Sequence, residues 1–366
     1  MTQTAIPCSV MRGGTSKGLV FLADDLPTDT ATRDAVLLAA MGSPDPRQID
    51  GLGGSHPLTS KVAIVSASAR DDADVEYLFL QVWPDRPEVS DTQNCGNMLA
   101  AVGPFAIERG LVTATDPITP VRIWMRNTDT LATAAVPTPD ARVSYEGAAR
   151  IDGVPGTHAP IPLDFADIAG STCGALLPTG SVADDIAGLR VTCIDNGMPV
   201  VCLAAADVGL TGHETPAEIE SNADACARIE EVRLAAGPLM GLGDVSSSTV
   251  PKMTLLSAAT DGGAVSTRTL IPHRVHEAIG VLGAVSVATA CLLPGSVAHW
   301  LATPPAATPG GVVDVEVEHP TGFFTVSLEV DDSTSPPTVR RSALLRTARL
   351  LMRGEVMVPA SVWSRS

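Results

Sequence analysis

Lysine is scarce in this chain of 366 residues: only three of its 24 lysines and arginines are lysine. An average globular protein holds several times more lysine, so arginine supplies most of the positive charge here. The three are Lys17, Lys61 and Lys252, and each follows Ser or Pro beside an apolar run. A desolvated lysine amine can lose its proton, whereas arginine stays charged. These lysines are therefore candidates for proton transfer, although compositional drift is the alternative.

The sequence also lacks the usual metal and disulfide patterns. Its seven cysteines are odd in number and unpaired in spacing, which is typical of reduced thiols in the cytoplasm. Neither C-x-x-C nor H-E-x-x-H occurs, so zinc motifs are excluded on spacing. His273 and His276, in "HRVH", have no third ligand at matching spacing. They are predicted to be helix-start residues at the binding cleft, with Arg274 between them as an anion clamp, and no metal or cofactor is expected.

A phosphate-binding loop is missing as well. The stretches "RGGTSKG" and "GLGGSHP" are rich in glycine, but the order G-x-x-x-x-G-K-[ST] is absent and no strand precedes a G-x-G-x-x-G. A nucleotide ligand is therefore disfavoured. Backbone amides in such tight turns can instead hold a carboxylate. The side chains expected to assist them are Thr15, Ser16, Ser55 and Ser60.

Charge and hydropathy exclude two classes of partner. The formal net charge of −17 argues against binding to nucleic acid or to an anionic membrane. Residues 279–298 form an uncharged run long enough to span a bilayer. The run is rich in small residues, is broken by Pro294 and has no aromatic belt, so a helix buried inside a sheet is expected. The N-terminal stretch shows no secretory pattern, and a cytoplasmic location is the expectation.

An internal repeat organises the chain. "SKVAIVSAS" from Ser60 and "PKMTLLSAA" from Pro251 align at an offset of 252 − 61 = 191. Residues 121–136 and 312–330 each predict two alternating strands joined by a polar turn, and 312 − 121 is again 191. Apolar, small-residue helices are predicted over 94–110 and 276–295. The two halves therefore predict two copies of one strand-rich unit around a buried helix.

The repeat places two domains along the chain. The boundary is predicted at 183/184, which gives domains 1–183 and 184–366. Small-molecule sites commonly form between domains, so the seam is the expected place of the site. Residues 340–359 predict a closing amphipathic helix, apolar at 344, 345, 350 and 351, followed by a short strand. This closing segment is expected to be able to pack back on the N-terminal domain.

One cysteine has a distinctive setting. Cys95 stands at the predicted start of a helix, flanked by Asn94, Gly96 and Asn97. Unpaired N–H groups and the helix dipole favour anions and thiolates at such an end. An inert core cysteine is the alternative. The remaining cysteines are interpreted as packing residues: Cys8, Cys173, Cys193, Cys202, Cys226 and Cys291.

Three N-terminal motifs together resemble a known family. "MRGGTSKG", "LTSKVAIV" and "NCGNMLAAVGPFAIERGLV" are similar to those of the PrpF-like isomerases, most closely the 4-oxalomesaconate tautomerases or Δ-isomerases of aromatic-acid degradation. The likeness runs over nearly the whole chain. It implies an α+β, diaminopimelate epimerase-like fold: two similar domains, each a curled sheet around a central helix, with the site in the cleft between them. It also implies that Lys61 is the essential lysine and Cys95 the active-site cysteine.

The second half departs from epimerases that use two thiols. Aligning Gly110 with Gly295 places Gly280 opposite Cys95, so no second thiol faces the first. This favours an isomerase that works with one amine and one thiol.

The reaction implied is a cofactor-free 1,3-proton shift in an unsaturated oxo-tricarboxylate, with Lys61 as base. Cys95 would return a proton or position the substrate. A homodimer is the assembly that the resemblance allows. Two alternatives stay open: a 2-methylaconitate isomerase of PrpF type, and an accessory protein to an aconitase-like enzyme. The substrate-binding residues expected are Thr15, Ser16, Lys17, Ser55, Ser60, Asn94, Gly96, Asn97, Lys252, Arg274, His319 and Thr321.

Overall fold

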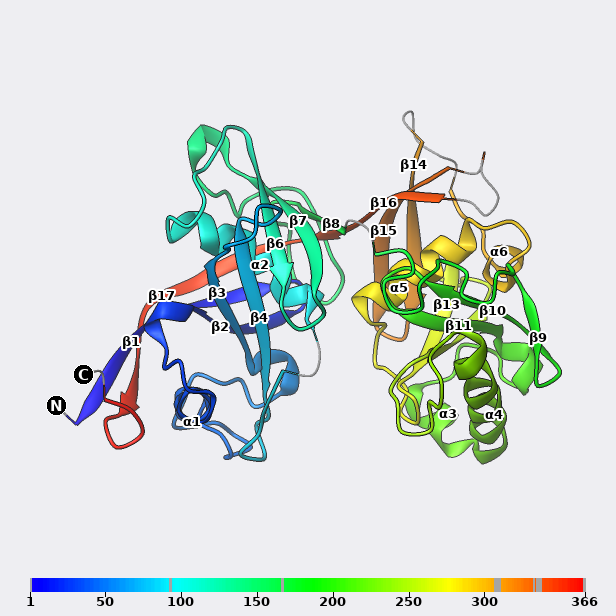
Figure 1. Cartoon of the computed structure of the whole chain (residues 1–366), viewed down its shortest axis with the longest axis horizontal. Coiled ribbons are helices and arrows are strands. Elements are labelled where there is room, and N and C mark those ends of the chain that lie inside the picture. The colour runs from blue at the N-terminus through cyan, green and yellow to red at the C-terminus, as the bar shows by residue number, and fades with distance from the viewer. Residues whose placement is uncertain are drawn as a thin grey trace. The chain divides into compact units, whose positions relative to one another are not determined.

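The computed structural model describes residues 2–91, 94–165, 168–305, 311–331, 333 and 338–364. The chain divides into two compact units, one of residues 1–164 with 345–366 and the other of residues 165–344 (Figure 1). The boundary predicted at 183/184 therefore lies inside the second unit. The closing segment belongs to the first unit, which is the packing that the sequence allowed.

The first unit is a curled sheet around a helix, α2 (Gly96–Glu108). Its strands are hydrogen-bonded in the order β17-β1-β2-β3-β4-β6-β7, with β2/β3 and β4/β6 parallel. A further helix, α1 (Thr30–Met41), packs on the opposite side of the sheet from α2. The strands are β1 (Gln3–Gly13), β2 (Ser16–Leu22), β3 (Lys61–Ala67), β4 (Val75–Val82), β5 (Val89–Ser90), β6 (Ile118–Met125), β7 (Thr130–Pro137), β8 (Ile161–Phe165) and β17 (Ala348–Pro359).

The second unit repeats this topology. Its strands follow the order β9-β10-β11-β12-β13-β14-β15-β16, again with the pairs β11/β12 and β13/β14 parallel. Both predicted hairpins and both predicted central helices are therefore confirmed, as is the duplication. The strands are β9 (Asp184–Ile186), β10 (Leu189–Asp195), β11 (Pro199–Ala204), β12 (Lys252–Ser257), β13 (Val265–Leu270), β14 (Val312–His319), β15 (Gly322–Asp331) and β16 (Thr338–Arg346). The helices are α3 (Pro216–Ser221), α4 (Ala223–Leu239), α5 (Val281–Cys291) and α6 (Val297–Leu301).

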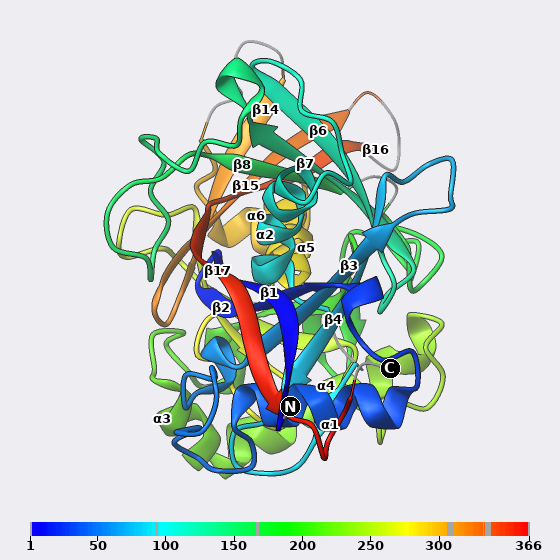
Figure 2. The same cartoon turned by 90° about the vertical axis from the view of Figure 1, so that its left-hand side faces the viewer.

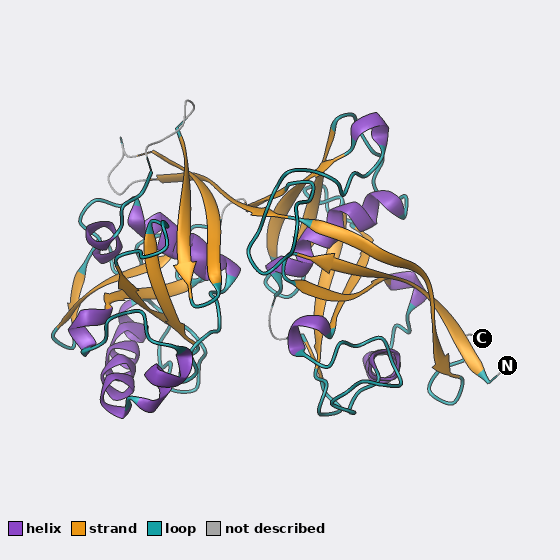
Figure 3. Cartoon of the chain, turned by 180° about the vertical axis from the view of Figure 1, so that it is seen from behind, coloured by secondary structure: helices purple, strands orange, loops and turns teal. Residues whose placement is uncertain are grey.

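The central helices carry small residues because the sheets approach them closely. Residues 98–106 of α2 and 283–291 of α5 are buried, and strands surround each helix (Figure 3). At Gly103 a Cβ atom would lie 2.7 Å from a methyl carbon of Val136, so a larger residue would push the sheet away. The uncharged run is thus a buried helix, as predicted. In the described part of the chain, no helix has the length and hydropathy needed to cross a membrane.

The closing helix predicted within residues 340–359 is wrong, because β16 and β17 cover this segment, whereas the short strand expected at its end is confirmed. β17 pairs antiparallel with β1 from Gln3↔Pro359 to Gly13↔Ala348, and Figure 2 shows the two strands side by side. Val356 and Val358 join Ile6 of β1 in the core beneath α1. The leucine pairs suit a helical face locally, but β1 offers a complete row of backbone hydrogen bonds, and that tertiary partner decides the outcome.

One close backbone contact between β2 and β3 leads to a stability prediction. Gly18 lies beside Lys61 in the parallel register, and a Cβ at Gly18 would lie 2.1 Å from the Lys61 carbonyl oxygen. Gly18→Ala should therefore lower the free energy of unfolding by about 1–3 kcal/mol, the usual cost of overpacking. Urea unfolding measures this. Gly354→Ala on β17 is the matched control, since its nearest atom is the flexible Met352 sulfur at 3.2 Å; equal stability of the two variants would contradict the prediction.

Candidate active site

Lys61 lies at the start of β3 and is buried, with 7% of its surface exposed. Its Nζ donates a 2.8 Å hydrogen bond to Oε1 of Gln81, the residue directly opposite on β4. The amine also lies 5.0 Å from the centre of the Phe79 ring, two residues along the same face of β4. Neither contact is a carboxylate. Lys61 is therefore buried beside uncharged groups, unlike a lysine on the protein surface.

Cys95 is the N-cap of α2, as the sequence predicted. Its side chain makes no capping bond, and the first turn of α2 holds no acidic residue, so the positive end of the helix dipole is left uncompensated. The backbone around it is fixed: its N–H donates to Oδ1 of Asn94 at 2.8 Å, and its carbonyl accepts from the Tyr77 hydroxyl at 3.2 Å. Burial raises the pKa of Tyr77 well above its ordinary value, so this donor stays neutral.

Lys61 and Cys95 belong to the same side of the sheet. Tyr77, Phe79 and Gln81 alternate along β4 and so share one face. Gln81 and Phe79 contact Lys61, while Tyr77 reaches the backbone of Cys95. The face that surrounds α2 therefore carries the amine, and Cys95 at the start of α2 lies against the same face through Tyr77.

The β1–β2 turn packs against the start of α2. At Gly13 a Cβ would lie 2.4 Å from the Asn97 carbonyl oxygen, and at Gly14, where φ is +51°, it would lie 2.1 Å from Asn97 Oδ1. Asn97 Nδ2 donates to Thr15 Oγ1 at 3.1 Å. Ser16 is 1% exposed, and its hydroxyl has no hydrogen-bond partner among the described residues. The glycines of "RGGTSKG" thus allow close approach, and they bring predicted binding residues to the helix end.

Ser55 and Ser60, two predicted carboxylate ligands, bind a glutamine instead. Oε1 of the buried Gln48 accepts from Ser60 Oγ at 2.6 Å and from Ser55 N–H at 2.8 Å, while Ser55 Oγ donates to the Arg47 carbonyl. The structure therefore gives these serines an internal task, which is to shape the loop that leads into Lys61. Sequence reasoning missed Gln48, since nothing local marks it.

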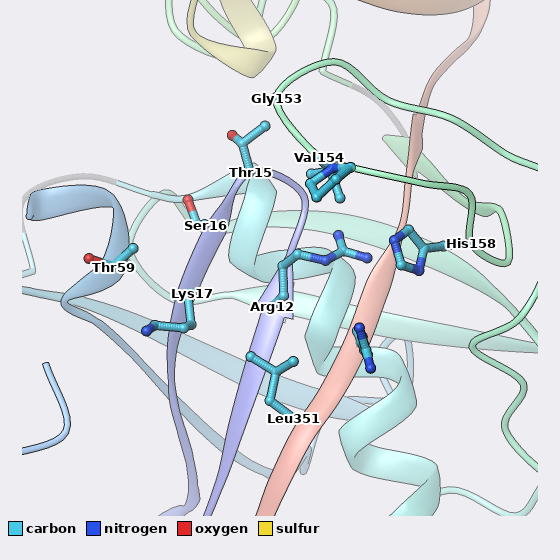
Figure 4. A pocket seen from close by; sticks show the side chains of 11 residues that line it. Arg12, Thr15, Ser16, Lys17, Thr59, Gly153, Val154, His158 and Leu351 are labelled. Carbon is cyan, nitrogen blue, oxygen red and sulfur yellow. The ribbon is translucent and has the colours of Figure 1, made fainter. Parts of the chain in front are cut away.

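A pocket of about 230 Å³ lies beside the turn and gathers Thr15, Ser16 and Lys17 with Arg12 (Figure 4). Lys61 and Cys95 do not line it. Arg12 pairs with Lys17 across β1 and β2. Because neighbouring residues alternate faces, Lys17 points to the side opposite Gly18 and Lys61. In Figure 4 its amine extends away from the Arg12 guanidinium.

Arg12, which sequence reasoning also missed, fixes the turn. Its Nη1 donates to the carbonyls of Gly14 at 2.9 Å and Thr347 at 3.0 Å, and to the Thr347 hydroxyl at 3.0 Å. Burial and the nearby Arg349 lower the pKa of Arg12. The sequence signal that could have indicated this role is the position of Arg12 directly before Gly13 and Gly14.

Lys252 occupies in the second unit the place that Lys61 has in the first. It starts β12 and pairs in parallel with Val200 of β11, as Lys61 does with Gly18. Its Nζ donates to the Thr249 carbonyl at 2.7 Å. Burial, with a contribution from Arg233, lowers the pKa of Lys252 to about 8. A sizeable fraction of this amine is therefore neutral near pH 8.

The second central helix begins without a thiol. Gly280 is the N-cap of α5, as Cys95 is of α2, which confirms the alignment made from the sequence. Nearby, Thr321 at the β14–β15 turn donates its hydroxyl to the Glu277 carbonyl at 3.0 Å, and its N–H donates to Nδ1 of His319 at 3.3 Å. Two of the binding residues predicted in this half, His319 and Thr321, thus lie at a hairpin turn that contacts the segment before α5.

The "HRVH" segment differs from the expectation. α5 begins at Val281, so His273 and His276 precede the helix instead of starting it. Arg274 has an 83% exposed side chain, and its Nε pairs with Glu220 at 3.0 Å. Burial, with Lys252 next, lowers the pKa of His276, which favours the neutral imidazole. Within the described ranges, no three His, Cys, Asp or Glu side chains are grouped closely enough to bind a metal.

Comparisons with known proteins agree with this architecture. A (4E)-oxalomesaconate Delta-isomerase of a Novosphingobium species is 60% identical over 352 residues, covering 96% of this chain and 97% of that protein. A 4-oxalomesaconate tautomerase of Pseudomonas putida is 57% identical over 364 residues, with 99% of each chain covered. A crystal structure of methylitaconate-delta-isomerase superposes with a TM-score of 0.87 at 36% identity, over 100% of this chain and 98% of the other.

More distant structures share the fold alone. A hydroxyproline epimerase from Agrobacterium vitis has a TM-score of 0.52 at 15% identity, over 98% of this chain and 93% of that one. Two similar units with a sheet curled around a central helix are the diaminopimelate epimerase-like, α+β fold that the sequence predicted. The sequence profile described as PrpF protein matches residues 3–359. The chain therefore belongs to the PrpF family.

Proposed function

We propose that this protein is an isomerase of 4-oxalomesaconate that moves one proton across three carbons and shifts the C=C bond. The observation that carries the proposal is the buried Lys61 amine, bound to neutral Gln81, on the face of the sheet that also holds Cys95. The names of the two similar proteins at 60% and 57% identity support the choice of substrate.

The proposed reaction starts with loss of a proton from the carbon next to the conjugated oxo group. Lys61, in its neutral form, takes this proton and becomes the ammonium. The electron pair left behind delocalises into a dienolate. Unpaired N–H groups at the start of α2 stabilise the negative oxygen. Cys95 then gives a proton to the distal carbon and is left as the thiolate. The ammonium of Lys61 loses its proton and the thiolate gains one, directly or through solvent, so the enzyme is restored, the product is an isomer and no redox partner is consumed.

Carboxylate binding is the second requirement, since the substrate carries three. We assign this task to the start of α2 and the β1–β2 turn, where Thr15, Ser16 and Asn97 gather. The unpartnered Ser16 hydroxyl is the strongest single candidate, because a buried polar group without a partner is costly. Lys17, Lys252, Arg274, His319 and Thr321 remain proposals, and Arg274 is the weakest because it already pairs with Glu220.

Purified protein alone tests the function. Ultraviolet absorbance should change when 4-oxalomesaconate is added, because the conjugation of the substrate changes. The same assay with 2-methylaconitate tests the PrpF-type alternative, which a 2-methyl-aconitate isomerase from Cupriavidus necator supports at 36% identity. Turnover without any added protein would exclude a purely accessory role. No turnover of 4-oxalomesaconate by folded protein would refute the proposal.

A further inference from the structure

The Lys61 amine has a single hydrogen-bonding side chain in the described part of the molecule, and that side chain is Gln81. Gln81 is 2% exposed and lies directly across from Lys61 in the β3–β4 register. The bond length of 2.8 Å from Nζ to Oε1 is that of a well-formed hydrogen bond. We propose that Gln81 is a positioning residue that aims the amine of Lys61 and keeps the base free of a neighbouring negative charge. The inference rests on the function proposed above.

The amide of Gln81 can point only one way. Its Nε2 is surrounded by backbone carbonyl oxygens: Pro57 at 3.1 Å, Ser60 at 3.2 Å and Val82 at 3.3 Å. A flipped amide would place its oxygen against these oxygens and its NH₂ against the amine. The three carbonyls accept hydrogen bonds and cannot donate them, so the atom that faces them must be the nitrogen of the amide. The oxygen is therefore held toward Lys61.

A fixed acceptor gives the amine a direction. Neutral lysine has two N–H groups and one lone pair. When one N–H donates to Oε1 of Gln81, rotation about the terminal C–N bond is restricted. The Phe79 ring, whose centre lies 5.0 Å from Nζ, limits it further. The lone pair then keeps a narrow range of directions, which is the preorganisation that a general base requires.

The neutrality of Gln81 matters as much as its geometry. An aspartate or glutamate at a similar distance would favour the ammonium form and would delay loss of the proton to higher pH. The other titratable groups on the elements around Lys61 do not supply such a charge. Tyr77 is kept neutral by burial, Lys17 lies on the opposite face, and His56 uses Nδ1 to accept from the Leu58 N–H. Glu76 of β4 points to the opposite face of the strand and pairs with Arg126. Cys95, whose carbonyl accepts from the Tyr77 hydroxyl, is the proton donor of the proposed reaction.

The matching experiment replaces the amide by a carboxylate of the same shape. The carboxylate keeps an acceptor toward Lys61 but sets its second oxygen against the carbonyls of Pro57, Ser60 and Val82, so a loss of stability is also expected. For Gln81→Glu we expect the rising limb of kcat against pH to move to higher pH by about one unit or more, the effect of a close opposite charge. At a pH below the wild-type limb, kcat should fall about tenfold for every pH unit by which the limb moves. At high pH the activity should return toward that of the wild type. KM should change less than kcat, because Gln81 touches the base and not the substrate.

Gln48→Glu is the matched control. Gln48 is also a buried glutamine close to the same loop, but its oxygen accepts from Ser60 and Ser55 and does not touch Lys61. A carboxylate there retains these acceptor roles, so the limb should stay where the wild type has it. Circular dichroism and urea unfolding show whether each variant is folded. If Gln81→Glu does not fold, Gln81→Asn tests the same point, since its shorter amide withdraws the acceptor and should lower kcat at every pH without moving the limb.

The possible results separate the two proposals. Wild type that fails to turn over 4-oxalomesaconate refutes the proposed function and needs no variant. Active wild type with an unmoved limb in Gln81→Glu refutes the positioning role alone. The same movement of the limb in Gln48→Glu also refutes it, because the effect would then come from the loop as a whole.

Discussion

Lys61→Arg should lose isomerase activity as fully as Lys61→Ala does, about 10²- to 10⁴-fold in kcat, although it keeps the positive charge. Guanidinium stays protonated at any pH used for an assay and cannot act as a base. The site also has little room for the larger group, because Lys61 is buried against Gln81 and Phe79. The measurement is steady-state kinetics of the purified variants with 4-oxalomesaconate.

Lys252→Arg is the internal control for this prediction. Lys252 holds the equivalent place in the second unit, but its amine donates to the Thr249 carbonyl, a contact that arginine can also make. We expect this variant to lose less activity than Lys61→Arg. Retention of most kcat by Lys61→Arg would show that residue 61 binds a carboxylate, and the base would have to be sought elsewhere.

Cys95→Ala should uncouple hydrogen exchange from isomerisation. In heavy water the variant should still exchange the abstracted hydrogen for deuterium, because Lys61 can form the dienolate and return a solvent deuteron. Product formation should fall by about 10²- to 10⁴-fold, since the distal carbon lacks its acid. Lys61→Ala should do neither. NMR of the substrate in deuterated buffer follows exchange and product together.

Other outcomes of the exchange experiment assign different roles. Exchange that persists in Lys61→Ala and disappears in Cys95→Ala would make the thiolate the base. Equal loss of both signals in both variants would mean that the amine and thiol act as one coupled unit. Cys95→Ser, which keeps a proton donor of similar size, should recover part of the isomerisation if delivery of a proton is the role of Cys95.

Local sequence patterns determined a large part of this molecule. The offset of 191 between the two lysine segments and between the two hairpins revealed the duplication, and the strand order of the two units follows it. The small-residue, uncharged runs predicted the central helices, because only small side chains fit inside a sheet curled so tightly. Alignment of the helix ends also placed Gly280 opposite Cys95, as the two N-caps show.

Some site residues could be predicted from local sequence, and others could be recognised only in the folded structure. Lys61, Cys95 and the glycine turn were found from motifs because their chemistry depends on local features: a strand start, a helix start and a backbone with φ above zero at Gly14. Gln81 was not predicted, because its contact with Lys61 depends on the register of β3 with β4. The sequence suggested that Ser55 and Ser60 bind a carboxylate, but in the structure both donate hydrogen bonds to Oε1 of Gln48.

The sequence by itself thus determined the duplication, the buried helices and the two residues proposed for proton transfer, since each depends on neighbouring residues. Only the tertiary structure decided that residues 348–359 are a strand on β1, that Arg274 pairs with Glu220, and that a glutamine holds the lysine. The physical reason is common to all three. Backbone hydrogen bonds and ion pairs between distant segments outweigh local preference where they are available, and the register that creates them belongs to the folded chain as a whole.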